Sequence, residues 1–200
     1  MTLNFAAFHA MATALLSGAF FLAVIFLLVR LWARGNRDER RAQVGHYADY
    51  GLYLAVAVGW LFSLAAVVTG FLIWPLEAVL NSPIIKNKLT IVLMLVVIWG
   101  AFLYVRWQVG NRLWQNPLLT LFASLSVLVG FFFNLLANSI GGDAAGNASG
   151  FEQIVRIVGI ETRMTFYIPT WTIVVLALLT AGCIAIGIAA TRPSPQRTRT

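Results

Sequence analysis

The sequence contains few charged residues. Only 10% of its 200 residues are charged and 60% are hydrophobic, whereas about 25% of the residues of an average soluble domain are charged. A fold of this composition has too few charged groups to solvate its own surface in water. The composition therefore excludes an ordinary soluble domain and indicates an integral membrane protein.

Cysteine and histidine are also scarce. The single cysteine, Cys183, lies within an apolar run, so neither an internal disulfide nor a cysteine metal site can form within one chain. The only histidines are His9 and His46. No segment matches a catalytic signature, and the sequence does not indicate an enzyme that acts on its own.

Five apolar runs make up most of the chain, and each is long enough to cross a hydrocarbon layer of about 30 Å as a helix. Runs without apolar and polar alternation exclude a transmembrane barrel. The predicted fold is an all-α integral membrane bundle of five transmembrane helices, forming a single domain over residues 1–190. The spans are about 8–31, 50–79, 89–107, 117–136 and 166–190.

The net charge of +7 indicates how the protein is oriented in the membrane and does not indicate a binding site for a ligand. The basic residues lie at the ends of the apolar runs and not in a patch with interleaved aromatic residues, which excludes a nucleic-acid partner. With the first span exiting inward, ten basic residues lie inside and four outside. The positive-inside rule then places the N-terminus outside and the C-terminus in the cytoplasm of a multi-pass protein of the cell (inner) membrane. The first run lacks a basic start and has its arginines after it, which favours a mature helix over a signal peptide.

The segments between the spans give further expectations. Trp74 and Pro75 should kink or end the second helix and leave Glu77 in the interface, followed by a short re-entrant or interfacial piece through Asn81 and Pro83. A flexible outer loop should open at Gly141. Apolar residues at helical spacing then predict one interfacial helix at about 151–160, and residues 191–200 form a flexible basic tail.

His9 is the most suggestive single residue, because imidazole is a common axial ligand for the iron of haem b or the metal of a chlorin. The alternative is a histidine that hydrogen-bonds near the lipid headgroups. His46 is predicted just before the second helix, on the opposite side of the membrane, within an aromatic belt with Tyr47 and Tyr50. This separation argues against a haem held by both histidines of one chain. A haem ligated by His9 and Met164, a five-coordinate chlorin and a haem shared between subunits stay open.

Asn134 and Asn138 lie four residues apart and share one helix face. They could form a polar outer pocket for a quinone headgroup or an ion with Glu77, Glu161 and Arg163. Alternatively, the two amides join helices by hydrogen bonds, and Glu161 and Arg163 form a loop charge pair of little energetic value. Further candidates for this pocket are Lys86, Lys88 and Tyr167.

Two tryptophans and several small residues are predicted to pack between helices. Trp60 and Trp99 lie deeper than the interfacial tryptophans, so each indole needs an acceptor or a flat partner. Small residues recur four positions apart and allow close approach of helices, either within the bundle or with another subunit. Examples are Gly59 with Ser63 and Ser126 with Gly130.

The order of several short motifs resembles a family of small four-helix bacterial membrane domains of unknown function that accompany haem and electron-transfer proteins. The matching stretches are His9, Thr69-Gly70-Phe71-Leu72-Ile73-Trp74, Lys86-Asn87-Lys88 and Ser139-Ile140-Gly141-Gly142-Asp143. The resemblance implies an electron-transport setting. The chain departs from the family pattern in three ways: no proline follows His9, lysines replace the loop histidine, and a fifth helix is added.

Three functions follow as hypotheses. The first is an accessory, structural subunit of a multi-subunit electron-transfer assembly, respiratory or photosynthetic, with the lipid bilayer and other membrane subunits as partners. The second is an electron-transfer protein that binds haem or a chlorin through His9. The third is a small transporter, for which the sequence offers only one helix interrupted by proline and no charge near the bilayer centre.

Overall fold

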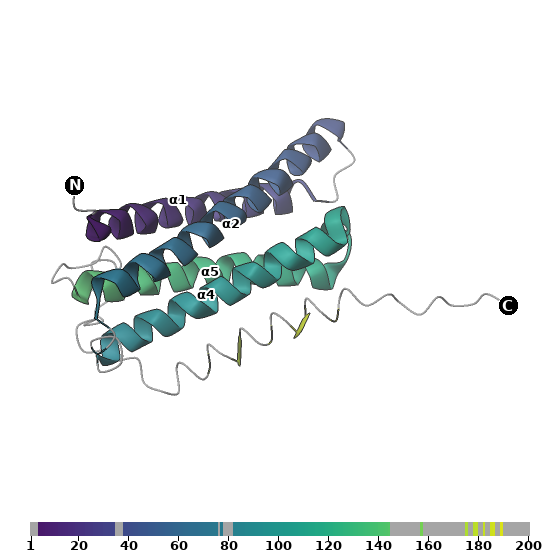
Figure 1. Cartoon of the computed structure of the whole chain (residues 1–200). Coiled ribbons are helices and arrows are strands. Elements are labelled where there is room, and N and C mark those ends of the chain that lie inside the picture. The colour runs from purple at the N-terminus through teal and green to yellow at the C-terminus, as the bar shows by residue number, and fades with distance from the viewer. Residues whose placement is uncertain are drawn as a thin grey trace.

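The computed structural model describes residues 4–34, 38–75, 77 and 82–144, together with single residues between 157 and 189. Over this part of the chain the fold is helical and contains no strand. Four helices are long and apolar enough to cross a membrane, as expected for a multi-pass membrane protein. The elements are α1 (Phe5–Trp32), α2 (Glu39–Ile73), α4 (Pro83–Val109), the short 3₁₀ helix η1 (Gly110–Trp114) and α5 (Pro117–Ala144) (Figure 1).

The four long helices form a closed ring. α1 packs along α2, α2 along α4, α4 along α5, and α5 along α1, and successive helices run in opposite directions (Figure 1). The starts of α1 and α4 therefore lie at the same end of the bundle as the ends of α2 and α5. We call this the His9 end and the opposite end the Asp49 end.

Local sequence explains where the helices begin and end. Polar side chains cap the first turns by accepting backbone N–H groups that have no partner inside the helix. Proline at the first position favours the start of α4 and α5, and Pro75 ends α2 at Ile73, as predicted. The capping bonds run from Ala7 N to Asn4 (3.2 Å), Arg40 N to Asp38 (3.1 Å), Ile85 N to Ser82 (3.5 Å) and Leu118 N to Asn116 (2.9 Å).

Several predicted boundaries are wrong. α2 begins at Glu39 instead of residue 50, because the helix capped by Asp38 continues through polar turns that hydropathy does not detect. Pro83 starts α4 and is not part of a re-entrant piece, while Asn81 lies outside the described residues. α5 continues past residue 136 to Ala144, so Gly141 is helical and does not open a loop.

The core of the bundle is apolar and aromatic. Phe20, Leu52, Trp99, Phe122 and Phe133 are fully buried and come from all four helices. The packing is close enough that single methylene changes in this core should alter stability.

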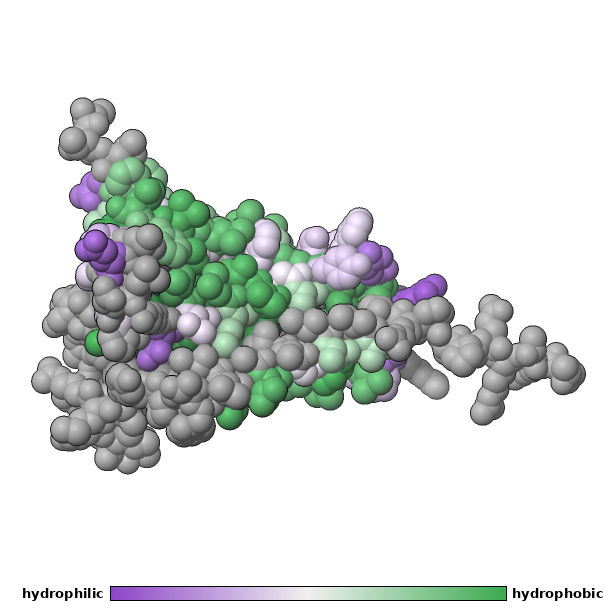
Figure 2. All heavy atoms as spheres, turned by 60° about the horizontal axis from the view of Figure 1, so that its bottom comes forward, coloured by the Kyte–Doolittle hydropathy of each residue, from purple (hydrophilic) through white to green (hydrophobic). Residues whose placement is uncertain are grey.

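The outer surface is apolar as well. Large hydrophobic side chains are exposed on every long helix, and Figure 2 shows hydrophobic residues over the middle of one face with hydrophilic residues toward its two ends. Such a surface suits contact with lipid and not with water. Examples are Ile25, Leu61, Val97 and Leu128.

Most of the predicted fifth span, the interfacial helix and the tail lie outside the described residues. Single described residues of that span, such as Val175 and Leu178, are helical, and Ile186 packs against the core. The fifth span and the orientation across the membrane therefore stay predictions.

Candidate functional site

A cavity of about 290 Å³ lies between all four long helices at the His9 end. Most of its lining is apolar, with residues such as Leu16, Val92 and Leu95. A few polar side chains interrupt this lining, the composition usual for sites that bind small molecules. They are His9, Thr13, Lys88, Asn134 and Asn138.

His9 is oriented by Thr69, which lies on the facing turn of α2. The Oγ1 atom of Thr69 is 3.1 Å from Nδ1 of His9, and the hydroxyl of Thr69 donates its proton to the carbonyl of Ala65 over 2.7 Å. A hydroxyl carries only one proton, so Nδ1 of His9 must be the donor in this pair. We infer from this network that a neutral His9 keeps the lone pair on Nε2 for another partner.

Lys88 brings a positive charge to the same cavity. Its ammonium lies against α5 at Gly141, where a Cβ atom would approach Nζ to 2.7 Å. Gly141 therefore leaves the space that the lysine occupies. Over the described part of the chain, Lys88 has no hydrogen bond or ion pair. Because an unpaired charge in an apolar site is costly, Lys88 is suited to an acceptor on a ligand.

The two asparagines join α5 to α1. Asn138 Nδ2 donates to Ser17 Oγ over 2.9 Å and to Asn134 Oδ1 over 3.3 Å. Asn134 Nδ2 donates to the same hydroxyl over 3.4 Å. Both asparagines also line the cavity. They therefore have both roles predicted from their spacing: they join two helices by hydrogen bonds, and they contribute polar groups to a pocket. Oδ1 of Asn138 accepts none of these bonds and can accept one from a ligand.

Of the other candidates for this pocket, Glu77 can be placed relative to the cavity. Glu77 is exposed and is not among the lining residues. Glu161, Arg163 and Met164 lie outside the described residues. The structure therefore unites the predicted pocket residues Lys88, Asn134 and Asn138, adds His9 to them, and leaves Glu77 outside the lining.

His46 lies within α2 and not before it, which corrects the prediction from hydropathy. It is exposed and meets the ring of Tyr50 edge-on, with centroids 4.7 Å apart. His46 precedes Thr69, the partner of His9, by 23 positions on this helix, a rise of about 35 Å. The two histidines therefore cannot hold one haem within a single chain.

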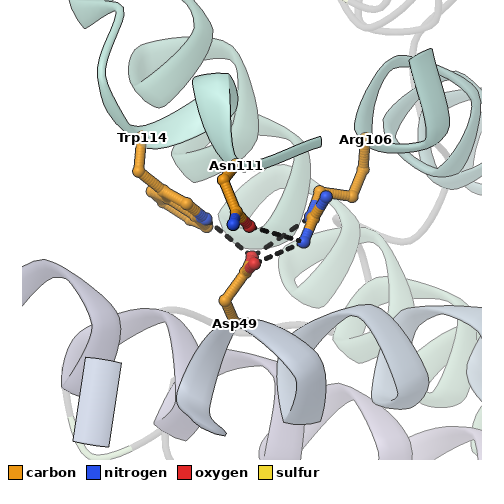
Figure 3. Close-up of polar contacts among 4 residues, drawn as sticks. All are labelled: Asp49, Arg106, Asn111 and Trp114. Carbon is orange, nitrogen blue, oxygen red and sulfur yellow. Dashed lines mark hydrogen bonds and ion pairs between the residues drawn. The ribbon is translucent and has the colours of Figure 1, made fainter. Parts of the chain in front are cut away.

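A buried ionic cluster, which the apolar pattern of the sequence does not predict, lies at the Asp49 end (Figure 3). Asp49 on α2 is buried and forms an ion pair with Arg106 on α4, whose Nε also donates to Asp49 Oδ1 over 3.2 Å. Trp114 Nε1 donates to the same oxygen over 2.6 Å, and Arg106 reaches Asn111 Oδ1 at 3.5 Å.

One signal could have revealed this cluster. Asp49 is the only acidic residue between Glu39 and Glu77, and a lone carboxylate beside an apolar run needs a partner. The tyrosines near Asp49 in the sequence, however, indicate only an aromatic belt at the membrane interface. Arg106 lies at the end of an apolar run, where the sequence alone indicates only one of the positive charges that orient the protein.

Among the residues described, no group of three or more His, Cys, Asp or Glu side chains could hold a metal ion. Comparison with known protein families, curated proteins and solved structures finds no match.

Proposed function

We propose that this protein is a non-catalytic subunit of a membrane electron-transfer assembly, respiratory or photosynthetic, and that it holds the headgroup of a quinone in the His9 cavity. The observation that supports the proposal is the convergence of His9, Lys88 and Asn138, from three helices, on an otherwise apolar cavity. The electron-transport setting rests on the resemblance of the short motifs to small membrane domains that accompany haem and electron-transfer proteins.

The polar groups of the cavity complement both forms of a quinone. The ammonium of Lys88 donates to a carbonyl oxygen of the oxidised ring. Nε2 of His9 and Oδ1 of Asn138 accept from the hydroxyl groups of the reduced ring. The volume of about 290 Å³ lies just below the range of roughly 300–1,000 Å³ for small-molecule sites. It suits one substituted ring, with the apolar tail left in lipid.

A binding measurement tests this function. The purified protein in lipid nanodiscs is titrated with a short-tailed ubiquinone analogue, and heat release is recorded. We expect saturable binding by the wild type and an affinity about tenfold lower, equivalent to about 1.4 kcal/mol, for His9→Phe and for Lys88→Met. His46→Phe is the matched control, because His46 is exposed at the other end. Non-saturable uptake, or equal affinity in all four proteins, would contradict the proposal.

A second candidate function is the binding of haem b or a chlorin through His9. The bond between Nδ1 of His9 and Thr69 favours it, because metal-bound histidines usually donate their other ring nitrogen to such a partner. Since His46 is remote, the metal would be five-coordinate, ligated by His9 and Met164, or shared with another subunit.

The test of this candidate is a reduced-minus-oxidised visible spectrum of the protein, extracted from native membranes in mild detergent. A Soret band or chlorin bands stoichiometric with the chain, and lost in His9→Ala, would support it. A featureless spectrum would remove this candidate and leave the quinone site unaffected.

A further inference from the structure

A second cavity, of about 350 Å³, lies at the Asp49 end. Its lining is mainly polar and is formed by α1, α2 and the η1 region. It is distinct from the His9 cavity, because the two sets of lining residues share no member. The lining residues with charged or ring side chains are Arg30, Arg34, His46, Asp49 and Trp114.

Positive charge exceeds negative charge in this cavity. Asp49 is the only acidic residue among the described residues that line it. Both oxygens of its carboxylate are engaged by Arg106 and Trp114 (Figure 3). Arg30 lies in the last turn of α1 and Arg34 in the turn that follows it. The only ion pair found over the described ranges is that of Asp49 with Arg106. Neither arginine forms an ion pair there, although the carboxylate of Asp49 still attracts Arg30 electrostatically.

The guanidinium of Arg30 is positioned by its neighbours, but they do not accept hydrogen bonds from all of its N–H groups. Its Cζ lies 5.1 Å from the centre of the Trp114 ring, a cation–π contact. Its Nη1 occupies space left by Gly45, since a Cβ there would lie 3.1 Å away. Its Nε is buried and finds no hydrogen-bond acceptor among the residues described. A buried N–H group of a charged side chain lowers the stability of the fold when it has no hydrogen-bond acceptor, unless a ligand supplies one.

We propose that this cavity binds the phosphodiester group of an anionic phospholipid, with Arg30 and Arg34 as its two cationic contacts. A planar guanidinium presents paired donors that match two phosphate oxygens. Basic pockets between transmembrane helices on the cytoplasmic side are known to take anionic headgroups.

The surroundings of the cavity favour a lipid over a free phosphate ion. Leu28 and Trp32 flank Arg30 in α1, and both are exposed apolar side chains. The guanidinium of Arg41 lies over the ring of Trp32, with Cζ 4.7 Å from the ring centre. Exposed tryptophan beside arginine is typical of the membrane–water interface. A phosphodiester bound there would have its acyl chains next to an apolar helix surface.

Thermal unfolding and native mass spectrometry of the purified full chain in detergent test the proposal. The probes are phosphatidylglycerol, phosphatidylcholine and inorganic phosphate, each added separately. We expect phosphatidylglycerol to raise the melting temperature saturably and to stay bound at one lipid per chain, with phosphatidylcholine and inorganic phosphate giving neither effect. Arg34→Gln should weaken this retention about tenfold, and Arg30→Gln at least as much.

Arg41→Gln is the matched control, because Arg41 is exposed and does not line the cavity. Arg34 is also exposed, so its variant keeps the test valid even if Arg30→Gln fails to fold. Equal loss of lipid in Arg41→Gln would show general surface attraction and overturn the proposal. Stabilisation by inorganic phosphate equal to that by phosphatidylglycerol would overturn the lipid as ligand.

Discussion

The indole of Trp99 on α4 lies against the ring of Phe20 on α1, with ring centroids 3.7 Å apart. These helices face each other across the ring of four. Glycines on the two remaining helices, Gly59 of α2 and Gly130 of α5, leave the space that the indole fills. All four long helices therefore meet at Trp99, which is fully buried.

Gly130→Ala should destabilise the bundle, because the added Cβ would overlap the indole of Trp99. Overpacking of this kind costs about 1–3 kcal/mol. Reversible unfolding by a denaturing detergent would measure the loss. Gly18→Ala is the control, since a Cβ at this position on α1 meets nothing within 4 Å. Unchanged stability of Gly130→Ala would show that the core does not require this glycine.

Asp49→Asn should lower stability more strongly. The substitution leaves the Arg106 charge unpaired while keeping an acceptor for Trp114. Breaking one side of a buried ion pair costs about 3–5 kcal/mol, whereas neutralising exposed Glu39 with Glu39→Gln should cost less than about 1 kcal/mol.

The double variant Asp49→Asn with Arg106→Gln checks this reason. It should be more stable than the sum of the single effects implies, because it removes both charges together. Additive losses in the thermal unfolding of these variants would argue against a direct pair.

Ser17→Ala should weaken the contact between α1 and α5. Its hydroxyl accepts the amides of Asn134 and Asn138, and hydrogen bonds between transmembrane helices contribute on average about 0.6 kcal/mol. Ser124→Ala is the control, because Ser124 donates only to Thr120 of its own helix. Detergent-induced unfolding of both variants measures the difference, and equal losses would deny the asparagines a joining role.

Thr69→Val should change the proton distribution on His9 without altering side-chain shape. Thr69 fixes the proton on Nδ1, so its loss should produce a mixture of the two neutral tautomers. Nitrogen NMR of labelled histidine, in a His46→Gln background with one histidine, reports the populations. Thr69→Ser should keep the wild-type spectrum. A single Nδ1–H form in Thr69→Val would show that another group orients the ring.

Much of the architecture was readable from local sequence. The apolar runs predicted the four spanning helices now described, and Pro75 marked the end of α2. The spacing of Asn134 and Asn138 placed them on one face. Hydropathy failed at helix ends, where capped helices such as α2 extend into polar sequence.

The sequence by itself determined a helical protein with helices apolar enough to cross a membrane, because continuous apolar runs without alternation can pair their backbone polar groups in lipid only as helices. It also determined which residues share a face of each helix. Only the tertiary structure decided which faces meet: His9 with Thr69, 60 positions away, and Asp49 with Arg106, 57 positions away. Helical periodicity fixes a side chain's direction about its own axis but carries no information on the neighbouring helix, which packing of the whole bundle selects.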